Sequence, residues 1–203
     1  HEEWRNIETG LVERAELLNL IFADIYGQRE LVRKGLLPAD LLFNHSGFSR
    51  ACDKVKLLSK RQLILYAADL ARGPDGRMWV LGDRTQAPSG AGYALENRSA
   101  MSRVFPNIFR DTRVERLDGF FQSLRQGLQQ IAPQNFDTPN VVILTPGPLN
   151  ETFFEHAYLA SHLGYPLVQG DDLTVRDGFV WLKSLNGLQR IDVIVSRVDD
   201  SFL

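Results

Sequence analysis

The sequence predicts an α/β protein, and three features of its 203 residues support that class. Apolar side chains recur at helical spacing in residues 4–26 and again in residues 114–131. Two apolar runs flank a Gly-Pro-Asp-Gly turn at residues 73–76, which indicates a β-hairpin. After residue 140, short apolar runs alternate with a helical stretch, and this order is typical of a parallel βαβ unit.

The first half of the chain is expected to be mainly helical. After the long first helix, the stretch "QRELVRKG" predicts a second helix that ends at Gly35, a residue suited to a helix C-terminus. A short helix is expected from Pro38, because proline favours the first helical position. The helix predicted over residues 114–131 is ended by Pro133, and "APQNFDTPN" is the expected linker.

This linker divides the chain into two predicted domains, residues 1–132 and residues 139–203. In the second domain, "VVILTPG", "PLVQG" and "IDVIVSRV" predict strands, and "LTVRDGFVWLK" predicts a hairpin that turns at Asp177 and Gly178. "NETFFEHAYLASHLG" predicts a helix with Asn150 as its N-cap. A parallel βαβ unit of this kind places ligand space at the carboxyl ends of its strands.

The Gly-Pro-Asp-Gly turn predicts which side chains share a face of the first hairpin. With the two arginines that flank the turn placed opposite each other, Asp69 faces Val80 and shares its face with Gly82 and Arg84. Asp83 then points to the other face. A bulge at Gly82 would change this register, since glycine within a strand often marks one. We expect Asp69 and Arg84 to lie within salt-bridge reach.

The stretch "GDRTQAPSGAGYALENR", residues 82–98, leads from the hairpin into a helix. Ser89 offers a hydroxyl group, Gly90 and Gly92 let the backbone approach a ligand, and N–H groups at a helix start favour an anion. The stretch predicts an anion-binding turn that faces a cleft shared with the βα unit. A plain connection capped by Ser89 is the alternative. Arg98 either reaches a phosphate or pairs with a nearby acid.

Composition argues against several classes of function. The net charge of −2 gives no support for a nucleic-acid or polybasic membrane surface. Cys52, the one cysteine, cannot form an internal disulfide, which fits a reducing compartment, so we expect a cytoplasmic location. No apolar run approaches the roughly 20 residues that span a bilayer. Because the sequence begins at His1 rather than Met and stops at "RVDDSFL", we expect a fragment of a longer polypeptide.

Four stretches resemble the circularly permuted ATP-grasp family that is related to glutathionylspermidine synthase. They are "GLLPADLL", "AADLARGPDGRMWVLGDRTQAPSGAGYALENR", "LTPGPLNETFFEHAYLASHLGYPLVQGDDLTVRDG" and "VDD". The resemblance implies a partial circularly permuted ATP-grasp lobe of helices plus hairpin, followed by a βαβ domain like the one that precedes unpermuted ATP-grasp lobes. It also implies that the remaining C-terminal part of the polypeptide carries much of the nucleotide pocket.

The family resemblance implies an ATP-dependent ligase that joins a small-molecule carboxylate to an amine through an acyl phosphate, with ATP and Mg²⁺ as cofactors. In the family pattern an Asp on one strand faces a Glu and an Asn, two residues apart, on the next strand. The Asp matches Asp69, but the other two positions hold Gly82 and Arg84. Glycine offers no side-chain oxygen and arginine cannot bind a cation, so the candidate metal ligands reduce to Asp69 and Asp83.

The stretch "PSGAGY" matches the family segment that contacts the substrate carboxylate or the phosphorylated intermediate. With this match, Ser89 is a candidate catalytic residue, and Arg98 in the following "LENR" is a second. The candidates for substrate or phosphate binding are Ser89, Gly90 and Gly92, and also Arg197 from a separate stretch.

Arg197 belongs to a further match, to a family Arg-Arg-Val-Asp-Asp pattern. Asp199 and Asp200 also match this pattern, whereas Ser196 replaces its first arginine. A salt-bridged domain junction is the alternative interpretation of this segment. Two functions therefore stay open: a portion of an acyl-phosphate ligase that is inactive by itself, or a non-catalytic ATP-grasp-like module that binds an anionic metabolite or a partner protein.

Overall fold

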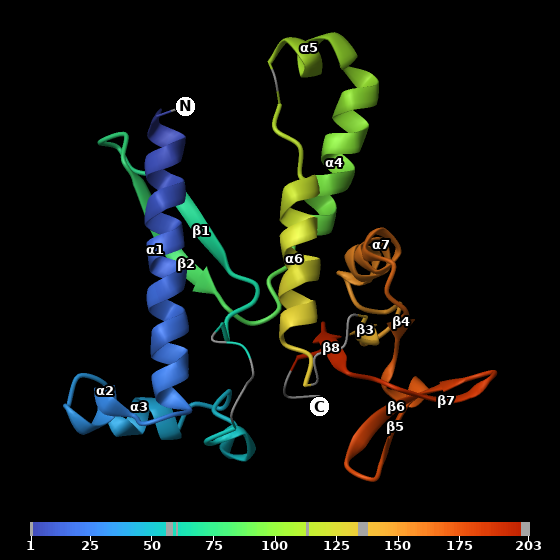
Figure 1. The fold of residues 1–203 in the computed structure, drawn as a ribbon. Coiled ribbons are helices and arrows are strands. Elements are labelled where there is room, and N and C mark those ends of the chain that lie inside the picture. Colours follow the sequence, from blue (N-terminus) through green and yellow to red (C-terminus); the bar gives the residue numbers. More distant parts are fainter. Residues whose placement is uncertain (1, 56–58, 60, 113, 134–137, 200–203) are drawn as a thin grey trace. The chain divides into compact units, whose positions relative to one another are not determined.

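The computed structural model describes residues 2–55, 59, 61–112, 114–133 and 138–199 (Figure 1). The chain forms two compact units, residues 1–88 and residues 89–203. None of the helices in the described ranges has the length and apolar character that crossing a membrane requires.

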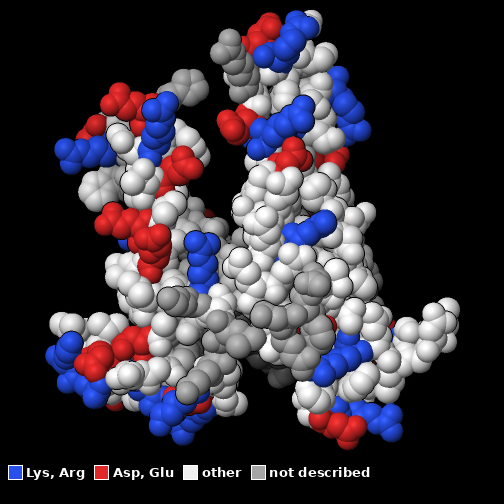
Figure 2. Space-filling view, in the orientation of Figure 1, with Lys and Arg blue, Asp and Glu red and all other residues white. Residues whose placement is uncertain are grey.

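The first unit combines helices with one hairpin, as expected for the start of the chain. The predicted long helix, the short helix before Gly35 and the helix after Pro38 are all present, and Gly35 has a positive φ of +68°. Acidic and basic side chains are mixed over the second helix, at the lower left of Figure 2. The elements are α1 (Glu2–Ile25), α2 (Glu30–Arg33), α3 (Ala39–Phe43), the 3-10 turn η1 (Arg50–Cys52), β1 (Ala67–Arg72) and β2 (Met78–Arg84).

The β1–β2 hairpin differs from the predicted register by a bulge. Asp69 pairs with Gly82 rather than with Val80, which pairs with Leu70 instead, so the predicted partner was wrong. Leu81 is the extra residue of the bulge. Pairing beyond the bulge still places Asp69 and Arg84 on one face.

The second unit carries most of the chain's buried core. The predicted parallel βαβ unit is confirmed: β3 pairs in parallel with β4 and with β8, and α7 lies between β3 and β4 in the chain. The elements are α4 (Ala91–Val104), α5 (Pro106–Asp111), α6 (Asp118–Gln130), β3 (Val141–Leu144), α7 (Phe153–Leu163), β4 (Leu167–Val168), η2 (Gly170–Asp172), β5 (Leu173–Arg176), β6 (Phe179–Ser184), β7 (Gly187–Arg190) and β8 (Val193–Ser196).

Three details of this unit were not anticipated. Helix α5 and strand β7 had no predicted counterpart, and β7 extends the predicted hairpin to an antiparallel sheet in the order β5-β6-β7. The N-cap of α7 is Thr152 rather than Asn150, whose side chain instead accepts a hydrogen bond from the Thr152 N–H at 2.9 Å. The end of α7 was predicted correctly, because Gly164, the last residue of "NETFFEHAYLASHLG", ends the helix in the left-handed conformation.

Strand β3 lies at the centre of the core because it is buried on both faces. Ile143 packs in a cluster with Phe121 of α6 and with buried residues of α7, whereas Val142 packs in a second cluster with Val168 and Ile191. This pattern is typical of a parallel strand, which is covered on both sides.

The chain divides at residue 89 and not between residues 132 and 139, where the boundary was predicted. The packing of α6 explains this difference. Phe121 is 4% exposed and belongs to the β3 core, so α6 joins the parallel sheet in one compact unit that begins at residue 89. Residues 134–137 of the predicted linker lie outside the described residues.

Candidate functional site

The loop between β2 and α4 encloses an anion, and that anion is a carboxylate of the same unit. The N–H groups of Gly90 and Gly92 both donate to Glu155 Oε1, at 2.6 and 2.9 Å. Gly90, the N-cap of α4, has a φ of +119°, a conformation that favours glycine. The start of α4 adds the positive end of its helix dipole to these two donors. The predicted anion turn therefore holds Glu155 within this structure.

Glu155 reaches the loop because of its position on α7. It shares a buried face of the helix with Leu159 and Leu163, which follow at intervals of four residues, and Glu155 itself is 0% exposed. A carboxylate on an apolar helical face requires internal partners, because an unpaired buried charge is very costly. This periodicity was the signal that could have identified Glu155, whereas the sequence analysis did not single it out.

Close packing against Glu155 explains the second glycine of the loop. A Cβ atom at position 92 would lie 2.8 Å from Glu155 Cγ, closer than real Cβ contacts allow. A second polar contact joins the same two helices, because the Tyr158 hydroxyl donates to Glu96 Oε2 at 2.9 Å. Gly92 thus lets α4 approach α7 closely enough for its N–H to reach the carboxylate.

Arg197 completes the surroundings of this carboxylate from the end of β8. Its Nη2 atom lies 3.7 Å from Glu155 Oε2, and the two side chains are 5% and 0% exposed. Burial lowers the pKa of Arg197, and the Glu155 charge opposes that shift. The Arg197 N–H donates to the Leu144 carbonyl at 2.8 Å, so this ion pair lies at the carboxyl ends of β3 and β8. Within its own unit Arg197 is an internal partner of Glu155.

His156, next to Glu155, lies in a chain of buried hydrogen bonds. Its Nε2 atom is 2.9 Å from Thr152 Oγ1, whose O–H donates to Asn150 Oδ1 at 2.6 Å. Because the Thr152 proton is used there, we assign Nε2 as the donor and Nδ1 as the acceptor from the Thr145 hydroxyl, at 2.9 Å. Burial, and then the Arg197 charge, lower the pKa of His156. The neutral ring fixes the loop between β3 and α7.

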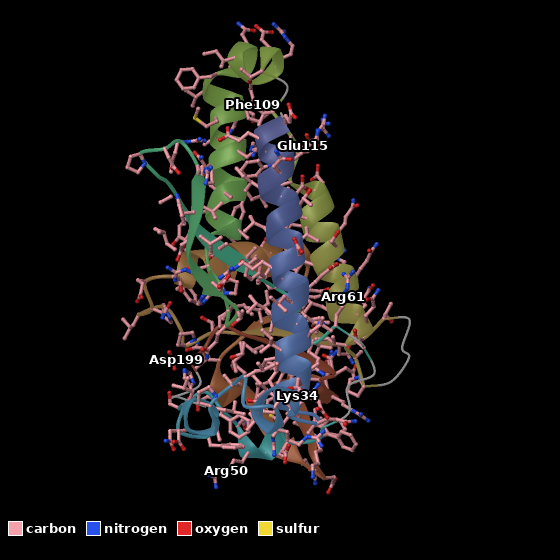
Figure 3. All side chains as sticks on the ribbon, turned by 90° about the vertical axis from the view of Figure 1, so that its left-hand side faces the viewer. Lys34, Arg50, Arg61, Phe109, Glu115 and Asp199 are labelled. Atoms are coloured by element: carbon pink, nitrogen blue, oxygen red, sulfur yellow. The ribbon has the colours of Figure 1, made fainter. Side chains whose placement is uncertain are left out.

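Ser89 and Arg98 are not brought together by α4. Ser89 is exposed, and its hydroxyl makes no hydrogen bond within the part of the chain that the structure describes. Arg98 lies eight residues beyond Gly90, about 12 Å of helix rise. Its guanidinium donates to the main-chain carbonyl of Glu115, which Figure 3 labels near Phe109. Arg98 therefore holds the segment before α6 instead of reaching the loop.

The hairpin in the first unit separates its two candidate metal ligands. Arg84 Nε lies 2.9 Å from Asp69 Oδ2 on one face, which confirms the expected salt bridge. On the other face Asp83 accepts hydrogen bonds from Arg14 at 2.7 and 2.6 Å and from the Tyr66 hydroxyl at 2.7 Å. Arg14 and Tyr66 lower the pKa of Asp83 to about 2, while burial and Asp83 raise the pKa of Tyr66 to about 12.

These residues do not fit a magnesium ion. Asp69 already has a cationic partner, Asp83 points to the opposite face, and Gly82 beside Asp69 supplies no oxygen. Among the described residues, no group of three or more His, Cys, Asp or Glu side chains could hold a metal ion. Asp200 of the predicted carboxyl-terminal signature lies outside the described residues.

Comparison with known proteins gives one consistent result. The family model described as "Circularly permuted ATP-grasp type 2" matches residues 1–203. The chain is 44% identical over 197 residues to the uncharacterized protein Rv2567 of Mycobacterium tuberculosis, covering 97% of this chain and 22% of that protein. It is 39% identical over 201 residues to the uncharacterized protein sll0335 of Synechocystis, covering 99% of this chain and 42% of that protein. The chain thus spans less than half the length of these curated relatives.

Proposed function

Because this chain belongs to the circularly permuted ATP-grasp type 2 family, we propose that it is the substrate-side portion of an ATP-dependent carboxylate–amine ligase. In the proposed reaction a substrate carboxylate oxygen attacks the γ-phosphorus of ATP and releases ADP. The amine nitrogen then attacks the acyl carbon of the acyl phosphate, a proton leaves the nitrogen, and inorganic phosphate departs. The glutathionylspermidine synthase relation fits this family and supports the same class of reaction.

One observation carries this proposal. Hydrogen bonds to Glu155 fix the backbone at the start of α4, and the neighbouring Ser89 is exposed. Glu155 engages the N–H groups of both loop glycines, so those two donors shape the loop. The hydroxyl of Ser89, next to these glycines, faces solvent and can donate to a substrate oxygen. We assign Ser89 to substrate binding and Glu155 to positioning the loop.

Magnesium and most of the nucleotide pocket belong, in this proposal, to the remaining C-terminal part of the same polypeptide. The donors described in residues 1–203 do not fit the metal, as the pairing of Asp69 and of Asp83 shows. The part played by this chain is therefore to orient the acid, and no step of the reaction at the metal is assigned to it.

The second candidate function is a non-catalytic ATP-grasp-like module that binds an anionic metabolite or a partner protein. The Asp69–Arg84 ion pair favours this alternative, because it puts a permanent positive charge beside the carboxylate that matches a metal ligand in the family pattern. A protein that kept the fold after losing the metal would show this kind of substitution.

An ADP-release assay on the full-length protein separates the two functions. Release that requires both an acid and an amine supports the ligase, and binding of acids without any ADP release supports the module. Ser89→Ala should then raise KM for the acid about tenfold, as expected for loss of one hydrogen bond. Ser123→Ala, a change at an exposed serine of α6, should leave KM unchanged. The 203-residue chain alone should release no ADP.

Gly90→Val is unsuited to this test. Gly90 has a φ of +119°, which a β-branched side chain rarely adopts, so the substitution would strain the backbone and disturb the bond to Glu155. We therefore expect that variant to change the fold of the loop as well as its binding, and Ser89→Ala isolates the hydroxyl.

A further inference from the structure

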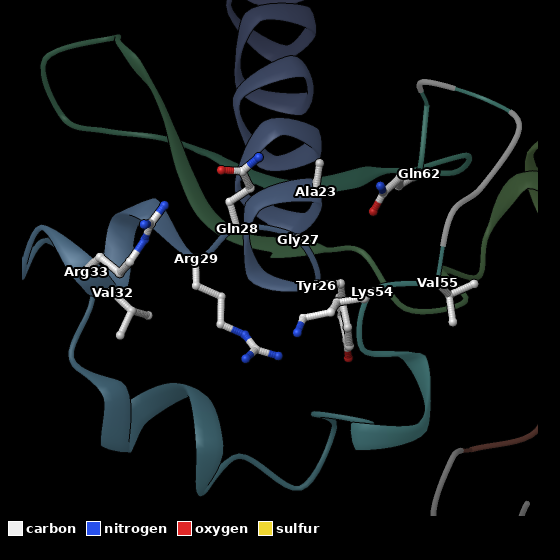
Figure 4. Close-up of a pocket in the computed structure, with 10 residues that line it drawn as sticks. All are labelled: Ala23, Tyr26, Gly27, Gln28, Arg29, Val32, Arg33, Lys54, Val55 and Gln62. Atoms are coloured by element: carbon white, nitrogen blue, oxygen red, sulfur yellow. The ribbon is translucent and has the colours of Figure 1, made fainter.

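A basic groove lies within the first unit. It has a volume of about 770 Å³ and is bordered by the end of α1, by α2 and by the segment around Lys54 (Figure 4). We use the name basic groove for the surface that carries Arg29, Arg33 and Lys54, together with Tyr26 and Gln62. Its size is in the usual range for small-molecule sites.

The charges of the basic groove are of one sign. Among the described residues that line it, Arg29, Arg33 and Lys54 are charged, and none is Asp or Glu. Outside the lining, Asp53 pairs with Arg29 and Glu30 pairs with Arg33. Lys54 makes no ion pair with any residue that the structure describes. The groove therefore offers two guanidinium groups, each paired with one carboxylate, and one ammonium group that has no ion-pair partner among the described residues.

Arg29 is held in place before any ligand arrives. Its Nε donates to the Ile25 carbonyl at 3.1 Å, and its Nη2 binds Asp53. The guanidinium also lies over the rings of Phe43 and Phe48, at 5.5 and 6.0 Å from their centroids. A guanidinium fixed in this way loses little conformational entropy when it binds an anion, which favours binding.

Arg29 and Lys54 share an unusual backbone conformation. Both are non-glycine residues in the left-handed region, with φ of +56° and +59°. The Lys54 N–H donates to the Tyr26 carbonyl at 3.0 Å, which ties the Lys54 segment to the end of α1. Figure 4 shows the two side chains extending toward each other from the two sides of the groove. Such strained residues persist where the surroundings determine them, and they cluster at ligand sites.

The rest of the lining is apolar or neutral. Ala23, Val32 and Val55 offer apolar surface, and Gln62 offers an amide. From this combination we propose that the basic groove binds a phosphorylated small molecule with an apolar or aromatic body. The phosphate oxygens lie between the guanidinium of Arg29 and the ammonium of Lys54, both of which form charge-assisted hydrogen bonds with phosphate. The body packs on the apolar side chains.

Calorimetric titration of the full-length protein with phenyl phosphate tests this inference. Phenyl phosphate should bind more tightly than inorganic phosphate, because its ring adds apolar contact, and phenol should not bind measurably. Lys54→Gln should weaken phenyl phosphate binding about tenfold, since it removes one charged hydrogen bond. Lys54 is exposed and makes no ion pair within the described ranges, so the variant should fold.

Lys34→Gln is the matched control. Lys34 is an exposed cation beside Arg33 that does not line the groove, and its removal changes the net charge by the same amount. Equal binding by the parent and by Lys54→Gln would overturn the inference, as would equal weakening by the two variants, which would indicate only a general surface charge. Absence of phenyl phosphate binding at millimolar concentration would also overturn it. The readout is binding, so the result is independent of ADP release.

Discussion

At the scale of single residues, Glu155 determines what the glycine-rich loop can do. Its carboxylate accepts hydrogen bonds from Gly90 and Gly92 and lies near Arg197, so one buried side chain joins the starts of α4 and α7 and the end of β8. Removing this carboxylate takes the acceptor from two backbone donors and one charged partner from a buried cation, and breaking a buried pair of this kind typically costs about 3–5 kcal/mol. We therefore regard this contact as a condition for the shape of the loop.

The first prediction compares two glycines at equivalent helical positions. Gly92→Ala in α4 should destabilise the protein by about 1–2 kcal/mol, because overpacking against Glu155 outweighs the better helix propensity of alanine. Gly119→Ala in α6, where no atom lies within 4 Å of the added Cβ, should stabilise it by up to about 1 kcal/mol. Urea unfolding measures both changes, and a stabilising Gly92→Ala would contradict the close contact.

The second prediction concerns pH and His156. Burial lowers the pKa of His156 below its ordinary value of 6.5, so the folded state binds the proton less tightly than the unfolded state does. Its contribution is fully present above about pH 6.5 and is lost as pH falls through the folded pKa. Urea unfolding at pH 7.5 and 5.5 should show lower stability at pH 5.5, and His156→Gln should show a smaller difference. An equal pH dependence in both proteins would refute the assignment.

At the scale of elements, the β1–β2 hairpin separates charges by face. The Asp69–Arg84 pair is on one face and is roughly half exposed, so it contributes only about 0–1 kcal/mol to stability. The pair matters more for cation binding, because the Arg84 guanidinium lies beside the Asp69 carboxylate, which would otherwise attract cations. Asp83 on the opposite face binds Arg14 and Tyr66 and thereby connects the hairpin to α1.

The third prediction is that two substitutions create a metal site on this hairpin. Gly82→Glu combined with Arg84→Asn places a carboxylate and an amide next to Asp69, and a Cβ at position 82 meets nothing closer than Asp69 Oδ2 at 3.8 Å. Oxygen ligands of this kind suit hard divalent cations. Electron paramagnetic resonance should show Mn²⁺ binding by the double variant. If Arg84→Asn alone binds Mn²⁺ as tightly as the double variant, position 82 is not a ligand.

At the scale of the molecule, burial is divided unequally between the two compact units. Among the described residues, Leu42 is the buried hydrophobic residue of the first unit, whereas thirteen others, from Phe121 onward, are in the second. Buried apolar surface is the main favourable term in folding. The second unit should therefore be the more stable of the two.

The fourth prediction follows from this difference in burial. In native-state hydrogen exchange, the amides of β3 should exchange most slowly, and the amides of the β1–β2 hairpin should exchange faster, because their strands have few buried apolar contacts. Mass spectrometry of peptides from each unit measures the two rates. Equal protection in both units would show that they unfold together, and would contradict the expectation of separate stabilities.

Local patterns in the sequence were sufficient to predict most of the elements. Helical spacing predicted α1, the Asp177-Gly178 pair predicted the β5–β6 hairpin, and the order of apolar runs predicted the parallel unit. These features depend on neighbours only a few residues apart, which a single sequence displays directly. The Asp69–Arg84 pair was predictable for the same reason, because a tight turn determines which side chains share a face.

Only the tertiary structure decided how the parts are used. Glu155 meets Gly90 and Gly92 across more than sixty residues of chain, and nothing local to the loop indicates that its donors are already engaged. Similarly, the bulge at Leu81 and the inclusion of α6 in the β3 core depend on packing between distant segments. The sequence predicted an anion-binding loop, because glycines and a helix start present N–H groups, and it left a plain connection open as the alternative. Folding decided which anion, because burying Glu155 on the apolar face of α7 requires those donors as its partners.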